Sequence, residues 1–167
     1  MHLLRYAFFS LLMPLAAMAE TTTLAIPDQG WAVTFDAPPL RPVREADSND
    51  HYMYSANNNH FAITLYVDTP ACNGDDSHEA VLNCFWAKAS KDPLINQASV
   101  AKSCNQQYCK ISYDVENTFQ GASIRQTHIH FLFAYRDRWS NFHAAVSNPA
   151  DNDLKLLETF THSFNYQ

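Results

Sequence analysis

Three histidines are the residues whose types and spacing are best suited to chemistry in this chain of 167 residues. His128 and His130 are two positions apart in a segment with the alternation of a strand, so their side chains share one face. His143 falls in the next predicted strand, and a two-residue loop of Arg136 and Asp137 would place it directly opposite His130. Side chains paired in this way are roughly 5 Å apart. A one-residue slip would move His143 to the other face.

Three neutral imidazoles at this separation can bind zinc or copper and leave a coordination position open. One hypothesis is therefore a metal-binding protein or a metal-dependent hydrolase that uses His128, His130 and His143. The alternative is a polar sheet face, partly covered by loops, on which the histidines are hydrogen bonded. The sequence contains no nucleophile elbow, HExxH motif or phosphate-binding loop, and no carboxylate can be assigned as a general base. A non-catalytic role is favoured and no cofactor is expected, with zinc or copper as the alternative if the histidines bind a metal.

Two aromatic side chains are candidates for a binding surface. Tyr66 and Trp139 fall on predicted outward-facing strand positions, with Tyr52 and Tyr54 as further candidates. Such a patch would suit a protein or small-ligand partner. The alternative is that these rings pack in the core or between a helix and the sheet.

The four cysteines predict two disulfides. Cys72, Cys84, Cys104 and Cys109 form an even set, which in an exported protein is typical of a disulfide framework. The last two are separated by four residues, so they do not form a CxxC redox or metal motif. Three connectivities are possible. We favour Cys72–Cys84 and Cys104–Cys109, because the second pair would close the tip of a hairpin.

The amino end predicts export. Arg5 precedes an apolar stretch over 6–15, and small residues ending at Ala19 follow as a cleavage site. This pattern is typical of a signal peptide over 1–19, followed by a single domain over 20–167. The predicted location is periplasmic or secreted, and no integral membrane segment is expected after signal cleavage.

The charge balance argues against some partners. The chain has 11 Lys and Arg residues and 17 Asp and Glu residues, and removal of the signal peptide removes one Arg and no acid. The mature domain therefore carries a net charge of about −7 with its histidines neutral. Such acidity disfavours nucleic acid and anionic membranes. An unidentified protein or small ligand remains as the partner.

The elements that must position these residues follow from periodicity and from turn residues. An alternation of two predicts strands, and helical spacing after suitable N-cap residues predicts two helices. Asp76 is the predicted N-cap of the first helix, and Asn148, followed by Pro149, is that of the second. The predicted strands span 30–35, 51–55, 61–67, 99–102, 108–116, 126–135 and 139–147, with a polar loop over 38–50 and helices ending near 90 and 164. This order predicts an α+β domain with a central antiparallel sheet flanked by helices.

The layout resembles the PsbP/Mog1/DcrB-like superfamily. A short N-terminal strand leads into the segment from Gly30 and Trp31 to Pro38, and strands, a helix, a long hairpin and a C-terminal helix ending at Phe164 follow. The resemblance implies a central antiparallel sheet and a binding or accessory role, since members include photosystem accessory, nuclear-transport and bacterial periplasmic proteins. The favoured interpretation is an exported, soluble, non-catalytic binding or accessory protein. An inhibitor or immunity-type protein is one version of it.

Overall fold

The computed structural model describes residues 19–48, 50–72 and 74–167. The predicted signal peptide lies outside the described residues except for Ala19, and β1 begins at the next residue, Glu20. The strands are β1 (Glu20–Ile26), β2 (Trp31–Ala37), β3 (Arg41–Ser48), β4 (His51–Asn57), β5 (Phe61–Asp68), β6 (Ile95–Cys104), β7 (Cys109–Phe119), β8 (Ala122–Tyr135), β9 (Arg138–Ser147) and β10 (Asn165–Tyr166). The helices are α1 (His78–Ala89) and α2 (Asp151–Ser163).

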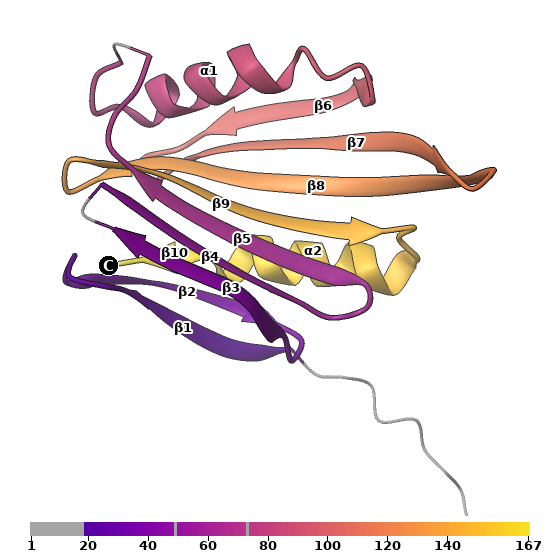
Figure 1. Cartoon of the computed structure of the whole chain (residues 1–167), viewed down its shortest axis with the longest axis horizontal. Helices are drawn as coiled ribbons and strands as arrows, with labels where there is room; N and C mark the ends of the chain where they lie inside the picture. Colours follow the sequence, from indigo (N-terminus) through magenta and orange to yellow (C-terminus); the bar gives the residue numbers. More distant parts are fainter. Residues whose placement is uncertain (1–18, 49, 73) are drawn as a thin grey trace, which may run out of the picture.

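The strands form two antiparallel sheets. The large sheet has seven strands in the order β3-β4-β5-β9-β8-β7-β6, and the small sheet has three in the order β1-β2-β10 (Figure 1). Each neighbouring pair in both sheets is antiparallel. The predicted α+β class, with one main antiparallel sheet and flanking helices, is confirmed.

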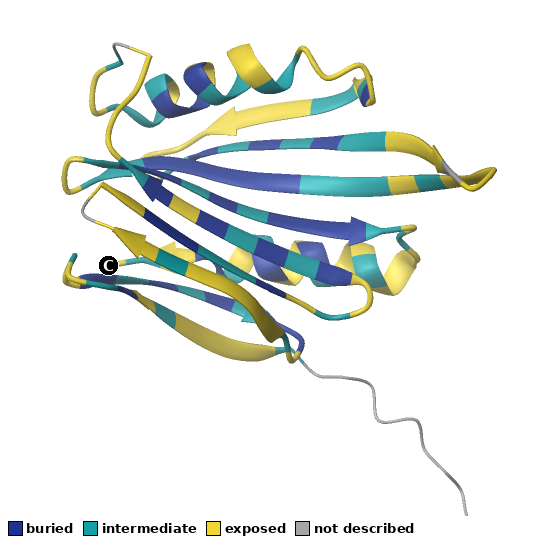
Figure 2. Cartoon of the chain, in the orientation of Figure 1, coloured by how far each residue is buried: buried dark blue, intermediate teal, exposed yellow. Residues whose placement is uncertain are grey.

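The inner face of the large sheet carries the main core. Along β5 the side chains alternate between buried and less buried positions, as expected for a strand with one face in the core (Figure 2). Phe160 of α2 is 0% exposed, and its ring contacts those of Phe35, Phe61 and Phe142. The small sheet and α2 therefore bury this face.

The outer face of the large sheet carries a second core beneath α1. Val81, Leu82 and Cys84 of the helix pack with a group that includes Leu132 and Trp139 of the sheet. At 12 and 13 residues, α1 and α2 are the helices of the described part of the chain, and no helix there is long and apolar enough to cross a membrane. Because α1 covers only part of the sheet, it creates a boundary between buried and open surface.

His78, the first residue of α1, ties the helix to the sheet. Its Nδ1 accepts a hydrogen bond from the Ala134 backbone N–H at 3.1 Å. Its Nε2 lies 3.3 Å from the Gln106 carbonyl oxygen, which can only accept. The ring therefore carries its proton on Nε2 and links α1 both to β8 and to the turn between β6 and β7.

Both helix starts differ from the prediction. The N-cap of α1 is Ser77, not Asp76, because the Ser77 hydroxyl accepts a hydrogen bond from the Ala80 N–H at 3.1 Å. The N-cap of α2 is Ala150, not Asn148, and its N–H donates to the Asp153 carboxylate at 2.9 Å. Asn148 instead accepts from the Arg125 N–H, so its side chain supports the sheet.

Two strands were missed. The segment predicted as a polar loop over 38–50 contains β3, an edge strand that pairs only with β4 and shifts register between Pro42 and Arg44. A mostly exposed edge strand does not need the apolar alternation that sequence analysis detects. The short strand β10 pairs with β2 after α2 ends, a pairing that depends only on tertiary structure.

The disulfides have the predicted local connectivity. Cys72–Cys84 joins the loop after β5 to α1. Cys104–Cys109 closes the turn between β6 and β7. Cys84 and Cys109 both belong to the second core, and the Cys72–Cys84 bridge attaches α1 to the loop after β5.

The Phe160→Ala variant should lose about 3–5 kcal/mol of unfolding free energy, because it empties the centre of the main core. Leu154 on the same helix is 45% exposed, and Leu154→Ala should cost about 0.5 kcal/mol or less. Urea unfolding followed by circular dichroism measures both. Equal losses in the two variants would contradict the described core.

Candidate functional site

The turn between β8 and β9 sets the positions of the three histidines. Arg136 and Asp137 are its two residues, and both have left-handed backbone angles, with φ of 51° and 58°. This is the requirement of the two-residue hairpin turn whose twist matches the flanking strands. His130 consequently lies directly opposite His143, as predicted from the loop length.

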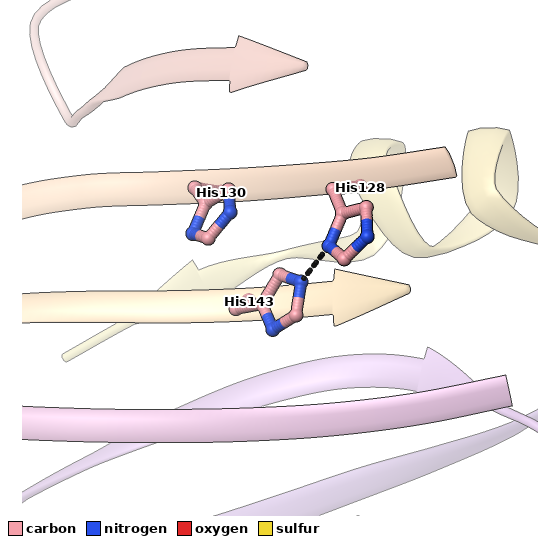
Figure 3. Close-up of side chains that lie close together, drawn as sticks. All are labelled: His128, His130 and His143. Atoms are coloured by element: carbon pink, nitrogen blue, oxygen red, sulfur yellow. Dashed lines mark hydrogen bonds between the residues drawn. The ribbon is translucent and has the colours of Figure 1, made fainter. Parts of the chain in front are cut away.

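The three imidazoles form one cluster (Figure 3). His128 Nδ1 and His143 Nε2 are 2.9 Å apart, and the two ring planes differ by only 8°. Their centroids are 5.1 Å apart, a distance that fits rings joined edge to edge through this hydrogen bond. His130 instead stacks on His143, with centroids 4.3 Å apart and planes 17° apart.

His130 is the most constrained member of the cluster. Its Nδ1 lies 2.9 Å from Asn141 Oδ1, and its Nε2 lies 2.9 Å from the Tyr113 hydroxyl. Since an amide oxygen can only accept, His130 Nδ1 carries the proton and donates it. In the neutral ring, Nε2 then accepts the hydrogen bond of Tyr113. We call Tyr113, His128, His130, Asn141 and His143 the histidine network.

Helix α1, not a set of loops, covers this network. The Phe85 ring lies 4.5 Å from the His130 ring, and His130 is only 5% exposed. The expectation of a polar face partly covered by loops was wrong in this respect. The reason is that α1 packs across β7 and β8, and β8 carries His128 and His130.

Burial keeps the histidines neutral. It lowers the pKa of His130 to about 4, although the hydrogen bond that His130 donates to Asn141 opposes the shift. It lowers the pKa of His143 well below its ordinary value, with the neighbouring histidines adding to the effect, and also lowers the pKa of His128. Burial raises the pKa of Tyr113 to about 12, so its hydroxyl keeps its proton.

The three histidines have the composition of a metal site, but most of their ring nitrogens already take part in hydrogen bonds. His128, His130 and His143 each offer a nitrogen, and these atoms lie within 4.8 Å of one another. His128 Nε2 is buried and has no hydrogen-bond partner. Both nitrogens of His130 are occupied, so a metal that used this residue would replace the bond from Tyr113 or the bond to Asn141. Glu79 also lies near Cys104 and Cys109, but the disulfide removes those sulfurs as thiolate ligands.

A pocket of about 550 Å³ opens beside the histidine network, between α1 and the outer face of the sheet. Its size is in the range of small-molecule sites. Apolar side chains from the helix and from β8 and β9 supply much of its surface, and charged side chains of α1, β5 and the loop after α1 join them. The lining residues are Asp68, Thr69, Ala71, Val81, Cys84, Phe85, Lys88, Ala89, Asp92, Leu132, Trp139, Ser140 and Asn141.

Asn141 belongs both to the network and to the pocket. Its Oδ1 accepts from His130, while the residue itself lines the pocket. Its position on the histidine face follows from the sequence alternation. Its contact with the pocket was missed, because the pocket exists only where α1 stops covering β9.

The two aromatics predicted for a binding surface lie on either side of Asn141. Tyr66 is 39% exposed and pairs with Asn141 across β5 and β9. Trp139 precedes Asn141 by two positions but is only 6% exposed, so the expectation that it lies on an open surface was wrong. It packs in the second core and lines the pocket. Tyr52 is 3% exposed and Tyr54 is half-buried, because both point to the inner face.

A larger hollow of about 880 Å³ lies against α2, away from the histidine network. Polar turn residues contribute much of its lining, including Asn57, Asn58 and Asn59. Asn58 already uses its side-chain oxygen to accept from two backbone N–H groups of the turn. This hollow is therefore a less specific candidate for a ligand-binding site than the pocket beside α1.

Acid should destabilise the fold through the network. The unfolded histidine binds a proton near its ordinary pKa of 6.5, whereas His130 in the fold resists protonation down to about pH 4. Unfolding therefore takes up protons as the pH falls through this window, and the unfolding free energy decreases. His130 alone should cost about 2 kcal/mol at pH 5 relative to pH 8.

Chemical unfolding between pH 8 and pH 4.5 measures how the unfolding free energy depends on pH. His130→Gln should make this dependence shallower, while the exposed His60→Gln should leave it unchanged. A slope that is the same in the wild type and in His130→Gln would contradict the assignment.

Comparison with known proteins shows the fold. No family model matches the chain, and no curated protein matches its sequence. Among solved structures, it is similar to LpqN of Mycobacterium tuberculosis, a protein described as involved in cell envelope biogenesis. The match has a TM-score of 0.51 and 11% identity, and it covers 89% of this chain and 91% of LpqN. The chain therefore shares the overall architecture of LpqN, and at this identity the likeness concerns the fold alone.

Proposed function

We propose that this protein is an extracytoplasmic, non-catalytic binding protein that holds a small, mainly apolar ligand between α1 and β9. The observation that carries the proposal is the pocket of about 550 Å³ with Leu132 and Trp139 in its lining. Pockets of this size with apolar walls and a few polar groups are the usual form of small-ligand sites.

The location is supported by the disulfides and by the similarity to LpqN. Two disulfides persist in an oxidising compartment. The predicted signal peptide makes the finer proposal a periplasmic or secreted protein.

A non-catalytic role is supported by the chemistry of the pocket. Ser140 Oγ has no hydrogen-bond partner, and Cys84 is in a disulfide, so neither of these lining residues is an activated nucleophile. The histidines are neutral and bonded mainly to one another, to Tyr113 and to Asn141. A protein-binding role, such as that of an inhibitor, would use exposed side chains like Tyr66, whereas the pocket favours a small ligand.

Filling the pocket should abolish binding of an apolar probe. Ala89 lines the pocket, so Ala89→Trp should weaken binding of N-phenylnaphthylamine by about tenfold or more through steric exclusion. Ala87 is exposed on the same helix and does not line the pocket, which makes Ala87→Trp the matched control. Dye fluorescence measures both. Absence of dye binding to the wild type, or equal binding to all three proteins, would contradict the proposal.

A metal site in the histidine network is the second candidate. It is favoured by the convergence of three neutral imidazoles and by the unpartnered, buried His128 Nε2. Three histidines suit zinc or copper, which would act as a Lewis acid if a coordination position stayed open for a substrate. The network's existing hydrogen bonds make this candidate weaker than the pocket.

Metal analysis separates the two candidates. If the histidines bind metal, untagged protein dialysed against zinc or copper should retain about one equivalent, and His143→Ala should lose it. His60→Ala, at an exposed turn, should retain the metal. No retained metal in the wild type would eliminate the metal site and leave the pocket proposal intact.

A further inference from the structure

We infer that Asn141 is the specificity-determining hydrogen-bond donor of the pocket and that the ligand is a neutral, apolar molecule bearing a carbonyl-type acceptor. This inference deepens the proposed function and rests on it. It follows from the way in which the histidine network uses one end of the Asn141 amide and leaves the other end open.

The first step is the orientation of the amide. His130 Nδ1 is 2.9 Å from Asn141 Oδ1, and the Tyr113 hydroxyl is 2.9 Å from His130 Nε2. Tyr113 therefore donates to His130, and His130 donates to Asn141, so the three residues form a chain of hydrogen bonds with one direction. Protonation of His130 would not reverse the last bond, because Nδ1 donates in both charge states.

The second step is the free end of the amide. Asn141 Nδ2 has no acceptor among the described residues, and it does not belong to the buried polar atoms that lack a partner. It is therefore accessible, and Asn141 lines the pocket. The network holds an amide N–H₂ group ready to donate at the pocket wall, with its orientation set before any ligand arrives.

The third step excludes the other polar lining groups as equivalent donors. Ser140 Oγ and Trp139 Nε1 are buried, so a ligand cannot reach them. Asp68 and Asp92 carry carboxylates, which can only accept when ionised, and each already accepts a hydrogen bond or forms an ion pair. Lys88 and Thr69 are the remaining side-chain donors of the lining, but both residues are exposed and neither is oriented by the histidine network.

The fourth step concerns ligand charge. One cation, Lys88, and two carboxylates, Asp68 and Asp92, line the pocket, so it has no excess of positive charge to hold an anion. His51 is paired with Asp68 at 2.5 Å, which occupies one of these carboxylates. Around Asn141, the apolar Leu132 and Trp139 favour an uncharged body. A ketone, ester or amide oxygen on an apolar molecule fits this combination.

A matched pair of dyes tests the inference. Prodan is a neutral naphthalene with a propionyl carbonyl, and dimethylaminonaphthalene lacks that carbonyl. Wild-type protein should bind Prodan about three- to tenfold more tightly than the carbonyl-free dye, the worth of one neutral hydrogen bond. Because a hydrogen bond to the carbonyl moves Prodan emission to longer wavelength, the bound dye also reports the contact directly.

Asn141→Leu removes the donor while keeping similar volume. It should weaken Prodan binding about three- to tenfold and shift the bound emission to shorter wavelength, while changing the affinity for the carbonyl-free dye by less than about twofold. Asn83→Leu, at an exposed position of α1 outside the pocket lining, should change neither dye. If Asn141→Leu does not fold, the wild-type protein still tests the inference, because equal affinity for the two dyes would overturn it.

The outcomes separate the inference from the proposed function. Binding of both dyes with equal affinity, each blocked by Ala89→Trp, would overturn the role of Asn141 and keep the pocket. Binding of neither dye would overturn both. Equal weakening of both dyes in Asn141→Leu would show that the residue only shapes the pocket, and would also overturn its role as a donor.

Discussion

The two-residue turn at Arg136 and Asp137 holds β8 and β9 in one register, and most of the molecule depends on that register. The period of a strand is two, so the turn sends Phe131 and Phe142 to the inner core and His130 and His143 to the outer face. A shift of β9 by one residue would send His143 to the inner core and Phe142 to the outer face. Arg136 reinforces the turn by donating to the carbonyl oxygens of Gln29 and Gly30, which lie between β1 and β2.

On the outer face, this register places the histidines where α1 covers them. A histidine pair on an open sheet would be a solvated surface feature, but α1 covers it and removes water. Desolvation keeps the imidazoles neutral, and neutral imidazoles can act as both donors and acceptors. That dual capacity allows Tyr113, His130 and Asn141 to form a directed chain that ends at the pocket.

Helix α1 buries the histidine network but does not cover the whole outer face of the sheet. Cys72–Cys84 and His78 hold α1 to the sheet, and the helix leaves the outer side of β9 near Trp139 uncovered. The similarity to LpqN concerns the architecture, and an architecture of this kind does not determine a ligand. The functional proposal therefore depends on the side chains at the boundary of α1 and not on the fold.

The local signals in the sequence were sufficient for much of the fold and for the positions of the histidines. Alternation along β5, β8 and β9, the two-residue turn and the cysteine spacing are short-range patterns, and each led to the observed element or pairing. The edge strand β3 lacks such a pattern because it is solvated. The N-caps differ because Ser77 accepts from the Ala80 N–H at the start of α1, whereas Asn148 accepts from the Arg125 N–H of β8.

Tertiary structure alone decided which groups face the pocket beside α1. The burial of Trp139, the cover over His130 and the open end of Asn141 all depend on where α1 lies, and the sequence of the strands contains no information about that position. By itself the sequence determined that three histidines share one face of a sheet. The packing of α1 decided that they form a neutral network behind a pocket, because it removes water from them and leaves Asn141 accessible.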